Sequence, residues 1–385
     1  MKKETSQHLN VIRIVGMAIA WTVMLIPTSF QYFSFDYDSG RFDITTTLFC
    51  LGGTAASFAV VNLLRRGFDV PFSLLMVGGA LFAVGNSVTY ASTVAYLLPG
   101  YLAYPFVALQ GAGTALFILS WVQLSSSLFP ATFAKDIATS MVGGALLLAI
   151  IAMLRNSPRL AWLWPFVAVA IMIVSLSCSF AVIRRKDTKP SELSIQGKVT
   201  NPYFVPLSIG LSLSVVGFVV LFSHAGVSNP QNSLAAAEGL IFAIIVLIAF
   251  LAFAHTQISK REPVWMVKLS FLVLIVGIMA NFASPHIFAL VSRALIFSGS
   301  ICAFFNLLIM LKVVSDRQSV SRSYAFALGF SFFYFGGTLA ETCLVISTSA
   351  QEEAVDELHL AMGILFSLII VALFVDAAFF LDGKP

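Results

Sequence analysis

The chain has 385 residues, of which 59% are apolar and 10% are charged, and its formal net charge is +4. Soluble proteins are about 45–50% apolar and about 25% charged, so this chain lacks the polar surface that soluble domains need. We therefore exclude an ordinary soluble protein. We also exclude a nucleic-acid-binding domain, whose basic residues would lie on a soluble face.

Apolar runs of about 20 residues, the length that crosses the hydrocarbon core as a helix, recur along the whole chain. Barrel strands alternate apolar and polar residues over about ten positions, and the run Leu240–Ala252 does not alternate. We predict an all-α membrane protein with twelve transmembrane helices in two six-helix bundles. The predicted spans are 11–33, 43–64, 71–92, 101–128, 136–154, 161–183, 203–224, 234–255, 264–282, 286–312, 322–348 and 358–381.

The loop charges predict the orientation of these spans. Residues Met1–Asn10 are polar and no signal-peptide cleavage site follows them, so the first span is expected to be retained. If the N-terminus is cytoplasmic, most of the 22 Lys and Arg residues fall on the cytoplasmic side, as the positive-inside rule requires. We predict that both termini are cytoplasmic. The bundles are 1–183 and 203–385, joined by a cytoplasmic loop, 184–202.

The two predicted bundles share several local patterns, which favour the parallel two-half repeat found in some transporters. The glycine pairs within these patterns are also expected to mark close contacts between helices. The shared patterns are a basic pair followed by proline (65–71 and 260–263), a patch of small residues (110–115 and 297–303) and a glycine pair (143–144 and 336–337).

This architecture resembles the major facilitator superfamily. The family's loop motif G-x-x-x-D-R-x-G-R-R corresponds to NLLRRGFDVP (62–71), which keeps a basic pair and a glycine but lacks the Asp-Arg element. The family's helix-four motif R-x-x-Q-G corresponds to 107–111, where Gln110 and Gly111 match and Val107 replaces the arginine. The resemblance implies a secondary transporter that moves a small organic solute across the cytoplasmic membrane by alternating access.

A second resemblance leads to an alternative function. The stretch 302–341 is similar to one in bacterial regulators of the LuxR type, which join a major-facilitator-like membrane domain to a helix-turn-helix module. This resemblance implies a membrane sensor domain that binds a ligand without transporting it. No direct binding of nucleic acid by this chain is expected.

Charged residues within the spans are the default functional candidates, because a charge at the bilayer centre is costly. Arg13, Asp136, Lys268 and Lys312 lie near cytoplasmic ends of their spans, and we expect their side chains to reach the membrane surface.

Glu238, Arg293 and Glu341 lie at similar depth in the outer half of the C-terminal bundle. An Arg293–Glu341 pair is expected either to hold that bundle together or to act in transport. In the second case Arg293 binds an anionic substrate group and a carboxylate exchanges protons.

Uncharged residues complete the predicted substrate site. Helices one and four commonly line the central cavity in the family, so the resemblance points to Trp21 and Gln110, and Asn306 is a candidate in the second bundle. The alternatives are a packed or lipid-facing ring for Trp21 and an interhelical hydrogen bond for Asn306. The chain has no nucleotide-binding G-x-x-x-x-G-K-[ST], no H-E-x-x-H and no G-x-S-x-G. We therefore predict no enzyme activity, no cofactor and no metal. The expected partners are the lipid bilayer and a small-molecule ligand, with proton or ion coupling.

Overall fold

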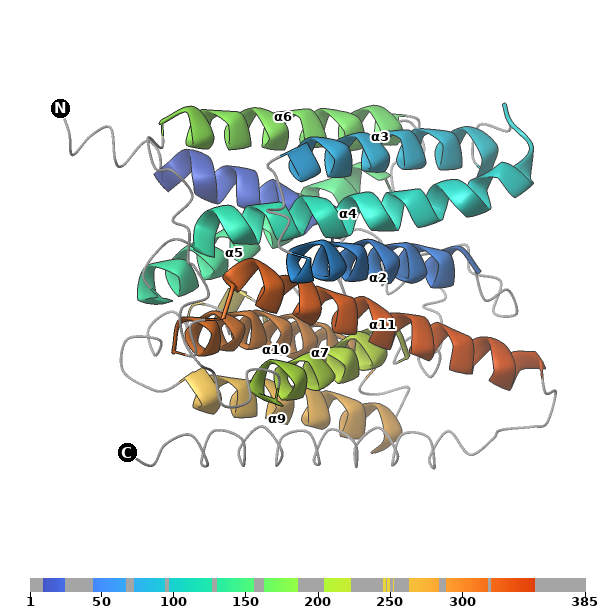
Figure 1. Cartoon of the computed structure of the whole chain (residues 1–385). Coiled ribbons are helices and arrows are strands. Elements are labelled where there is room, and N and C mark those ends of the chain that lie inside the picture. The colour runs from blue at the N-terminus through green and yellow to red at the C-terminus, as the bar shows by residue number, and fades with distance from the viewer. Residues whose placement is uncertain are drawn as a thin grey trace.

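The computed structural model is all-helical over the residues that it describes (Figure 1). These residues are 10–24, 44–66, 73–93, 97–126, 130–155, 163–185, 204–222, 263–283, 289–317 and 320–349, with positions 245, 246, 248, 249 and 252. The helices are the first helix (Asn10–Met24), α2 (Ile44–Arg65), α3 (Ser73–Thr93), α4 (Ala103–Ser126), α5 (Pro130–Arg155), α6 (Trp164–Arg185), α7 (Phe204–Phe222), α9 (Pro263–Ala283), α10 (Ala289–Arg317) and α11 (Arg322–Ser349), and a short 3₁₀ turn, Gly100–Leu102, precedes α4.

Each of these helices overlaps one predicted span, and two predicted boundaries are wrong. Helix α5 begins at Pro130 rather than at 136, because proline fits the first turn of a helix and the charge of Asp136 has a partner inside the fold. Helix α10 continues past 312 to Arg317, because Lys312 and Asp316 pair one turn apart. The predicted span 358–381 lies outside the described residues, and 234–255 meets them only at the isolated positions given above.

The described helices have the apolar character that a bilayer requires. By length and composition, four apolar segments among the described residues can cross a membrane, and shorter apolar helices accompany them. Apolar side chains are exposed on the outer faces of α3, α6 and α9, for example Val84, Ile173 and Val276, where lipid replaces water as the solvent. The four longer segments are Thr46–Arg65, Gly100–Ser125, Thr132–Ile151 and Ala294–Asp316.

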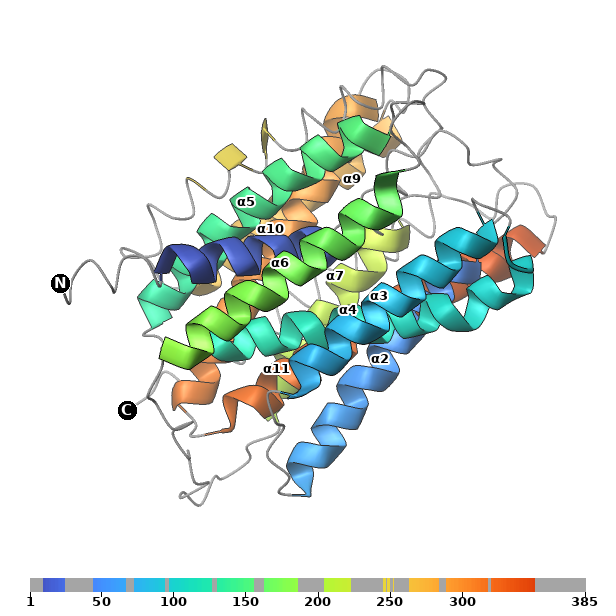
Figure 2. The same cartoon turned by 90° about the horizontal axis from the view of Figure 1, so that it is seen from above.

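We call residues 10–185 the first half and residues 204–349 the second half. Within the first half α4 packs on α2 and α3, and α3 packs on α6; within the second half α11 packs on α7, and α10 packs on α9. The halves meet where α11 lies against α2 and α4 and where α10 lies against α5. The helix axes run in broadly one direction in Figure 1, and the view from above in Figure 2 shows them crossing at angles.

Glycines mark the closest crossings, as the sequence predicted. A Cβ atom on Gly144 of α5 would lie 2.9 Å from the Ala18 carbonyl oxygen of the first helix. A Cβ atom on Gly336 of α11 would meet the Ser214 carbonyl oxygen of α7 more closely still. The first-helix–α5 pair and the α7–α11 pair therefore repeat one arrangement, six helices apart in chain order, and glycine permits both approaches because it has no side chain.

Candidate functional site

A chain of aromatic rings joins the two halves. Trp21 of the first helix meets Phe304 of α10 edge to face, with ring centroids 6.0 Å apart. Phe304 lies 4.6 Å from Phe333, which in turn lies 5.6 Å from Tyr334. Tyr334 then meets Phe49 of α2 at 6.3 Å, so the chain begins and ends in the first half and passes through the second.

The hydroxyl of Tyr334 is a polar atom in this chain of rings that lacks a hydrogen-bond partner among the described residues. The residue is 3% exposed, and its hydroxyl is buried with no hydrogen-bond partner among the described residues. Buried tyrosine hydroxyls usually find a partner. A ligand bearing a hydroxyl or carbonyl could therefore bond here while its apolar face packs on the neighbouring rings.

Trp21, the first member of this chain of rings, is held in place by burial and by a hydrogen bond. It is 1% exposed, and its indole nitrogen donates a hydrogen bond to the Ser140 hydroxyl of α5 at 3.0 Å. The indole therefore faces α5 and α10 and not lipid.

Gln110 and Asn306 lie outside the chain of rings, in contacts between other pairs of helices. Gln110 is half-buried on α4, and its amide nitrogen lies 3.5 Å from the Asn86 side-chain oxygen on α3. The Asn306 amide nitrogen donates to the Ser270 hydroxyl of α9 at 2.9 Å and approaches the Met266 carbonyl oxygen at 3.4 Å. This placement favours the interhelical hydrogen bond that the sequence left open as the alternative for Asn306.

The predicted group of outer charges consists of Arg293, Glu341 and Glu238. Arg293 lies in α10 and Glu341 lies in α11, but their side chains, like Glu238 as a whole, lie outside the described residues. The Arg293–Glu341 pair and the role of Glu238 therefore stay predictions.

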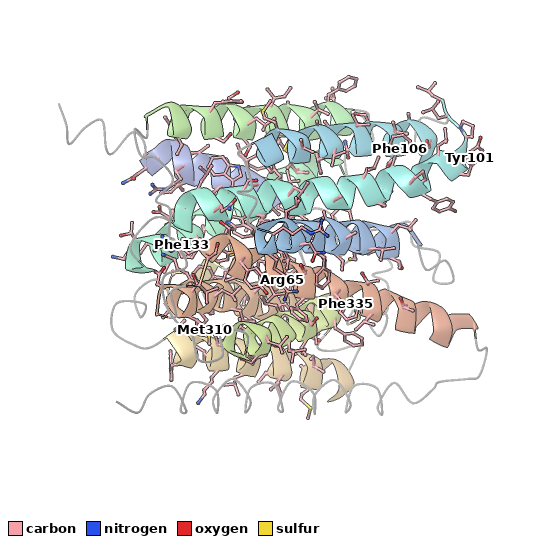
Figure 3. All side chains as sticks on the ribbon, viewed as in Figure 1. Arg65, Tyr101, Phe106, Phe133, Met310 and Phe335 are labelled. Carbon is pink, nitrogen blue, oxygen red and sulfur yellow. The ribbon has the colours of Figure 1, made fainter. Side chains whose placement is uncertain are left out.

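The two halves also meet at the end of the molecule that carries Arg13, Arg65, Lys135, Lys312 and Arg322, which we call the basic end. Figure 3 shows Phe133 near this end and Tyr101 at the opposite one. The guanidinium of Arg65, where α2 ends, donates to the Tyr324 hydroxyl at 3.1 Å and lies 5.8 Å from the centre of that ring. The Gln123 amide at the end of α4 donates to the Ser323 hydroxyl. The first turn of α11 is thus bound to both α2 and α4.

A second contact at the basic end joins α5 to α10 and α11. The rings of Phe133 and Phe326 lie 5.9 Å apart, and the Lys312 ammonium lies 5.6 Å from the centre of the Phe133 ring. Lys312 also bonds Asp316 at 2.9 Å, and Arg322 bonds the other oxygen of that carboxylate at 2.5 Å. One carboxylate therefore holds two cations next to an aromatic contact between the halves.

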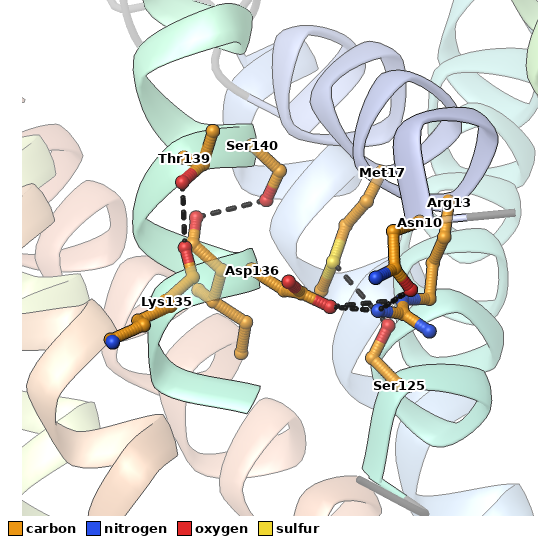
Figure 4. Close-up of polar contacts among 9 residues, drawn as sticks. Asn10, Arg13, Met17, Ser125, Lys135, Asp136, Thr139 and Ser140 are labelled. Carbon is orange, nitrogen blue, oxygen red and sulfur yellow. Dashed lines mark hydrogen bonds and ion pairs between the residues drawn. The ribbon is translucent and has the colours of Figure 1, made fainter. Parts of the chain in front are cut away.

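The first half has a buried ion pair of its own, between Arg13 of the first helix and Asp136 of α5 (Figure 4). The Nε and Nη2 atoms of Arg13 both donate to Oδ2 of Asp136, the first at 2.9 Å. The two side chains are 6% and 10% exposed. A guanidinium that donates twice to one carboxylate makes a strong charge-assisted contact, so this pair fixes the first helix against α5.

The prediction that these charges reach the membrane surface is wrong for Arg13, Asp136 and Lys312, because all three are buried among helices. It fits Lys268, which is exposed on α9. The depth of a residue along its own helix does not reveal which neighbouring helix covers it. The spacing of Lys312 and Asp316 was the one pattern in the sequence that could have shown a local partner.

The chain is similar in fold to three solved structures of transporters. No family model and no curated protein matches the chain. The chain is similar to the major facilitator transporter FucP in its outward conformation, with 13% identity, a TM-score of 0.60 and coverage of 94% of this chain and 97% of that one. It is also similar to the proton:xylose symporter XylE bound to 6-bromo-6-deoxy-D-glucose, with 14% identity, a TM-score of 0.61 and coverage of 95% and 94%.

A variant of the E. coli fucose:proton symporter FucP matches as well, with 11% identity, a TM-score of 0.56 and coverage of 95% and 97%. The chain has the major facilitator fold. The resemblance to LuxR-type regulators gains no support from these matches.

Proposed function

We propose that the chain is a secondary transporter of a small organic solute and has no enzyme activity. The observation that carries this proposal is the match to transporter structures over almost the whole chain, 94–95% of its residues. A fold shared from end to end implies that the two-half architecture on which alternating access depends is retained. In this proposal 1–183 and 203–385 are the two moving bundles, joined by the loop 184–202.

The ring chain between the halves is the proposed substrate site. Trp21, Phe304 and Phe333 supply apolar faces, and the unpartnered Tyr334 hydroxyl supplies a hydrogen bond. A site of this kind suits an uncharged or weakly charged solute with a flat apolar face and a polar edge. The names of the matched symporters make fucose and xylose the first solutes to test.

The loop charges support the orientation of the transporter. The basic end is proposed to face the cytoplasm of a bacterial cell, with both termini on that side of the cytoplasmic membrane. The contacts of Arg65, Gln123 and Phe133 with α11 then close the cytoplasmic side. The described conformation is therefore proposed to load its substrate from outside.

Uptake into proteoliposomes that contain the purified protein tests this function. A panel of labelled pentoses, deoxyhexoses and aromatic solutes should include at least one whose uptake is saturable. Tyr334→Phe should then weaken the apparent affinity by about tenfold, because it removes one buried hydrogen bond. Tyr104→Phe is the matched control, since Tyr104 is 44% exposed on α4, and it should transport normally. Saturable binding without any flux would support the sensor function instead.

A further inference from the structure

Three buried hydroxyl groups lie beside the chain of rings and have no hydrogen-bond partner among the described residues. They belong to Ser57 of α2, Ser300 of α10 and Tyr334 of α11. These residues are 0%, 1% and 3% exposed, in that order. A buried hydroxyl without a partner is costly, and a ligand that bonds it removes this cost. We propose that these hydroxyls select the solute, and that the solute is a neutral hydroxylated aromatic compound. The proposal rests on the proposed transport function and names its substrate class.

Ser57 lies on the face of α2 that meets α11. A Cβ atom on Gly53 would lie 2.7 Å from the Tyr334 ring, so this face of α2 packs on that ring. Residues four apart in a helix share a face, which places Ser57 one turn along α2 from the Tyr334 ring. The hydroxyls of Ser57 and Tyr334 therefore lie at the same contact between the two halves.

Ser300 lies one turn before Phe304 on the same face of α10. The centroid of the Phe304 ring lies 6.0 Å from that of Trp21 and 4.6 Å from that of Phe333. It also lies 5.7 Å from the centroid of the Phe330 ring. Ser300 is therefore next to the ring at which the two halves meet, and the three hydroxyls reach the chain of rings from α2, α10 and α11.

The two serines differ from other hydroxyl residues of the same helices. Serine and threonine in a helix commonly donate to the carbonyl oxygen of the residue four positions earlier. Ser298 of α10 donates to its own helix in this way at 2.6 Å, and Thr54 of α2 does so at 2.8 Å. The hydroxyls of Ser57 and Ser300 make no such bond. They therefore keep their bonding capacity for a ligand.

The chemistry of these groups favours a neutral ligand. A hydroxyl both donates and accepts hydrogen bonds, so hydroxyl groups of a ligand can bond each of the three residues. The chain of rings itself consists of uncharged groups, and the described cations lie toward the basic end, for example Arg65 and Lys312. A ligand carboxylate among these rings would have no cation beside it in the described part of the chain, and burial of an unpaired charge is costly.

The balance of rings and hydroxyls favours an aromatic ligand over a sugar. Aromatic rings attract one another when their centroids lie about 4.5–7 Å apart, so a ligand ring can replace the contact between Trp21 and Phe304 when the halves part. A sugar such as xylose carries a polar oxygen on nearly every carbon, and three hydroxyls are too few to bond them all. Each buried oxygen left without a partner weakens binding. The proposed class therefore differs from the fucose and xylose named for the similar structures.

Binding of radiolabelled tyrosol to the purified full chain in nanodiscs tests the ligand class. Tyrosol is an uncharged phenol that carries a hydroxyethyl group. It should bind saturably above the background of empty nanodiscs. Phenylethanol, which lacks the phenolic hydroxyl, should compete about tenfold more weakly than unlabelled tyrosol, because one hydrogen bond is lost. Hydroxyphenylacetate, the carboxylate analogue, and xylose should also compete more weakly than tyrosol. Absence of saturable tyrosol binding, or equal or stronger competition by hydroxyphenylacetate or xylose, would overturn the proposal.

Variants of the three hydroxyl residues locate the site. Ser57→Ala, Ser300→Ala and Tyr334→Phe each remove one hydroxyl, and at least two of them should weaken tyrosol binding by about threefold to tenfold. Ser298→Ala and Thr54→Val are the matched controls, because their hydroxyls bond to their own helices, and both should bind tyrosol normally. If one of the three variants does not fold, the other two decide. Normal binding in two of the three, or equal losses in the controls, would overturn the proposal.

Uptake measurements separate this ligand class from the transport function. Tyrosol binding that depends on the three hydroxyls, without uptake of tyrosol into proteoliposomes, would reject transport and support the ligand class. Saturable uptake of xylose without tyrosol binding would support transport and overturn the ligand class.

Discussion

The first-helix–α5 pair and the α7–α11 pair occupy corresponding places in the two halves, yet different interactions hold them together. In each pair a hydroxyl of one helix donates to a carbonyl of the other: Thr22 to Gly144 at 3.1 Å, and Ser214 to Phe332 at 2.6 Å. The α7–α11 pair adds a very close backbone approach at Gly336. The first-helix–α5 pair is looser at its glycine and adds the Arg13–Asp136 ion pair.

This difference shows that close backbone packing and an ion pair can each hold two helices together, but with different consequences. A contact made of glycine and backbone has one state, because it contains no group that changes charge. A contact made of an arginine and a carboxylate has two, because the carboxylate can take a proton. We call the first-helix–α5 contact the first seam and the α7–α11 contact the second seam. The repeat preserves the fold in both halves, and of these two seams only the first contains the titratable contact.

The largest effect is expected from breaking the Arg13–Asp136 ion pair of the first seam. Arg13→Ala leaves Asp136 as an unpaired buried carboxylate and should lower the free energy of unfolding by about 3–5 kcal/mol. Unfolding of the purified protein in mixed detergent measures this loss. The double variant Arg13→Met with Asp136→Leu should recover most of the stability, because neither charge remains. Equal stability of Arg13→Ala and the unmodified chain would contradict a structural role for the pair.

A methyl group in the second seam should have the next largest effect. Gly336→Ala places a Cβ atom against the Ser214 carbonyl oxygen, and separating α7 from α11 should cost about 1–3 kcal/mol in the same unfolding measurement. Gly144→Ala in the first seam should cost less, because its Cβ atom would lie 2.9 Å from the nearest oxygen. The reverse order would show that the first seam is the tighter one.

Trp21→Phe tests the hydrogen bond between the indole and Ser140. The ring contact with Phe304 can persist, so the loss of stability should be near the average of about 0.6 kcal/mol for a hydrogen bond between membrane helices, and below about 1.7 kcal/mol. Unchanged stability of Trp21→Phe would show that this hydrogen bond contributes nothing to the contact between the first helix and α5.

The smallest effect is expected for Ser214→Ala. The Phe332 carbonyl loses one donor but keeps its place in α11, so the change in unfolding free energy should be no more than about 0.6 kcal/mol. Thr22→Val removes the corresponding hydroxyl of the first seam and is its matched control. Similar small effects in both would confirm that these hydroxyls are equivalent, whereas a large effect in either would break the correspondence between the seams.

The sequence predicted the helices and their glycine contacts well, because both depend on local composition. Apolar runs located α2 and α11 to within a few residues, and the pair Gly143–Gly144 marked a true crossing. The Arg13–Asp136 contact was missed because its partners are 123 positions apart, and only the tertiary fold brings them into register. The unpartnered hydroxyl of Tyr334 was missed for a similar reason, since burial from several helices leaves no local pattern.

Helix α10 is enclosed by protein on nearly all sides, with most residues from Ala294 to Ser315 buried. Such a helix has little surface for lipid, although it carries Asn306 and Lys312 in its interior-facing positions. As the chain is inserted into a membrane, α10 enters before α11, which supplies part of its cover. The polar groups of α10 must therefore be shielded by α7, α9 or the insertion machinery until α11 arrives. The buried surface of α10 is thus complete only once α11 has been inserted.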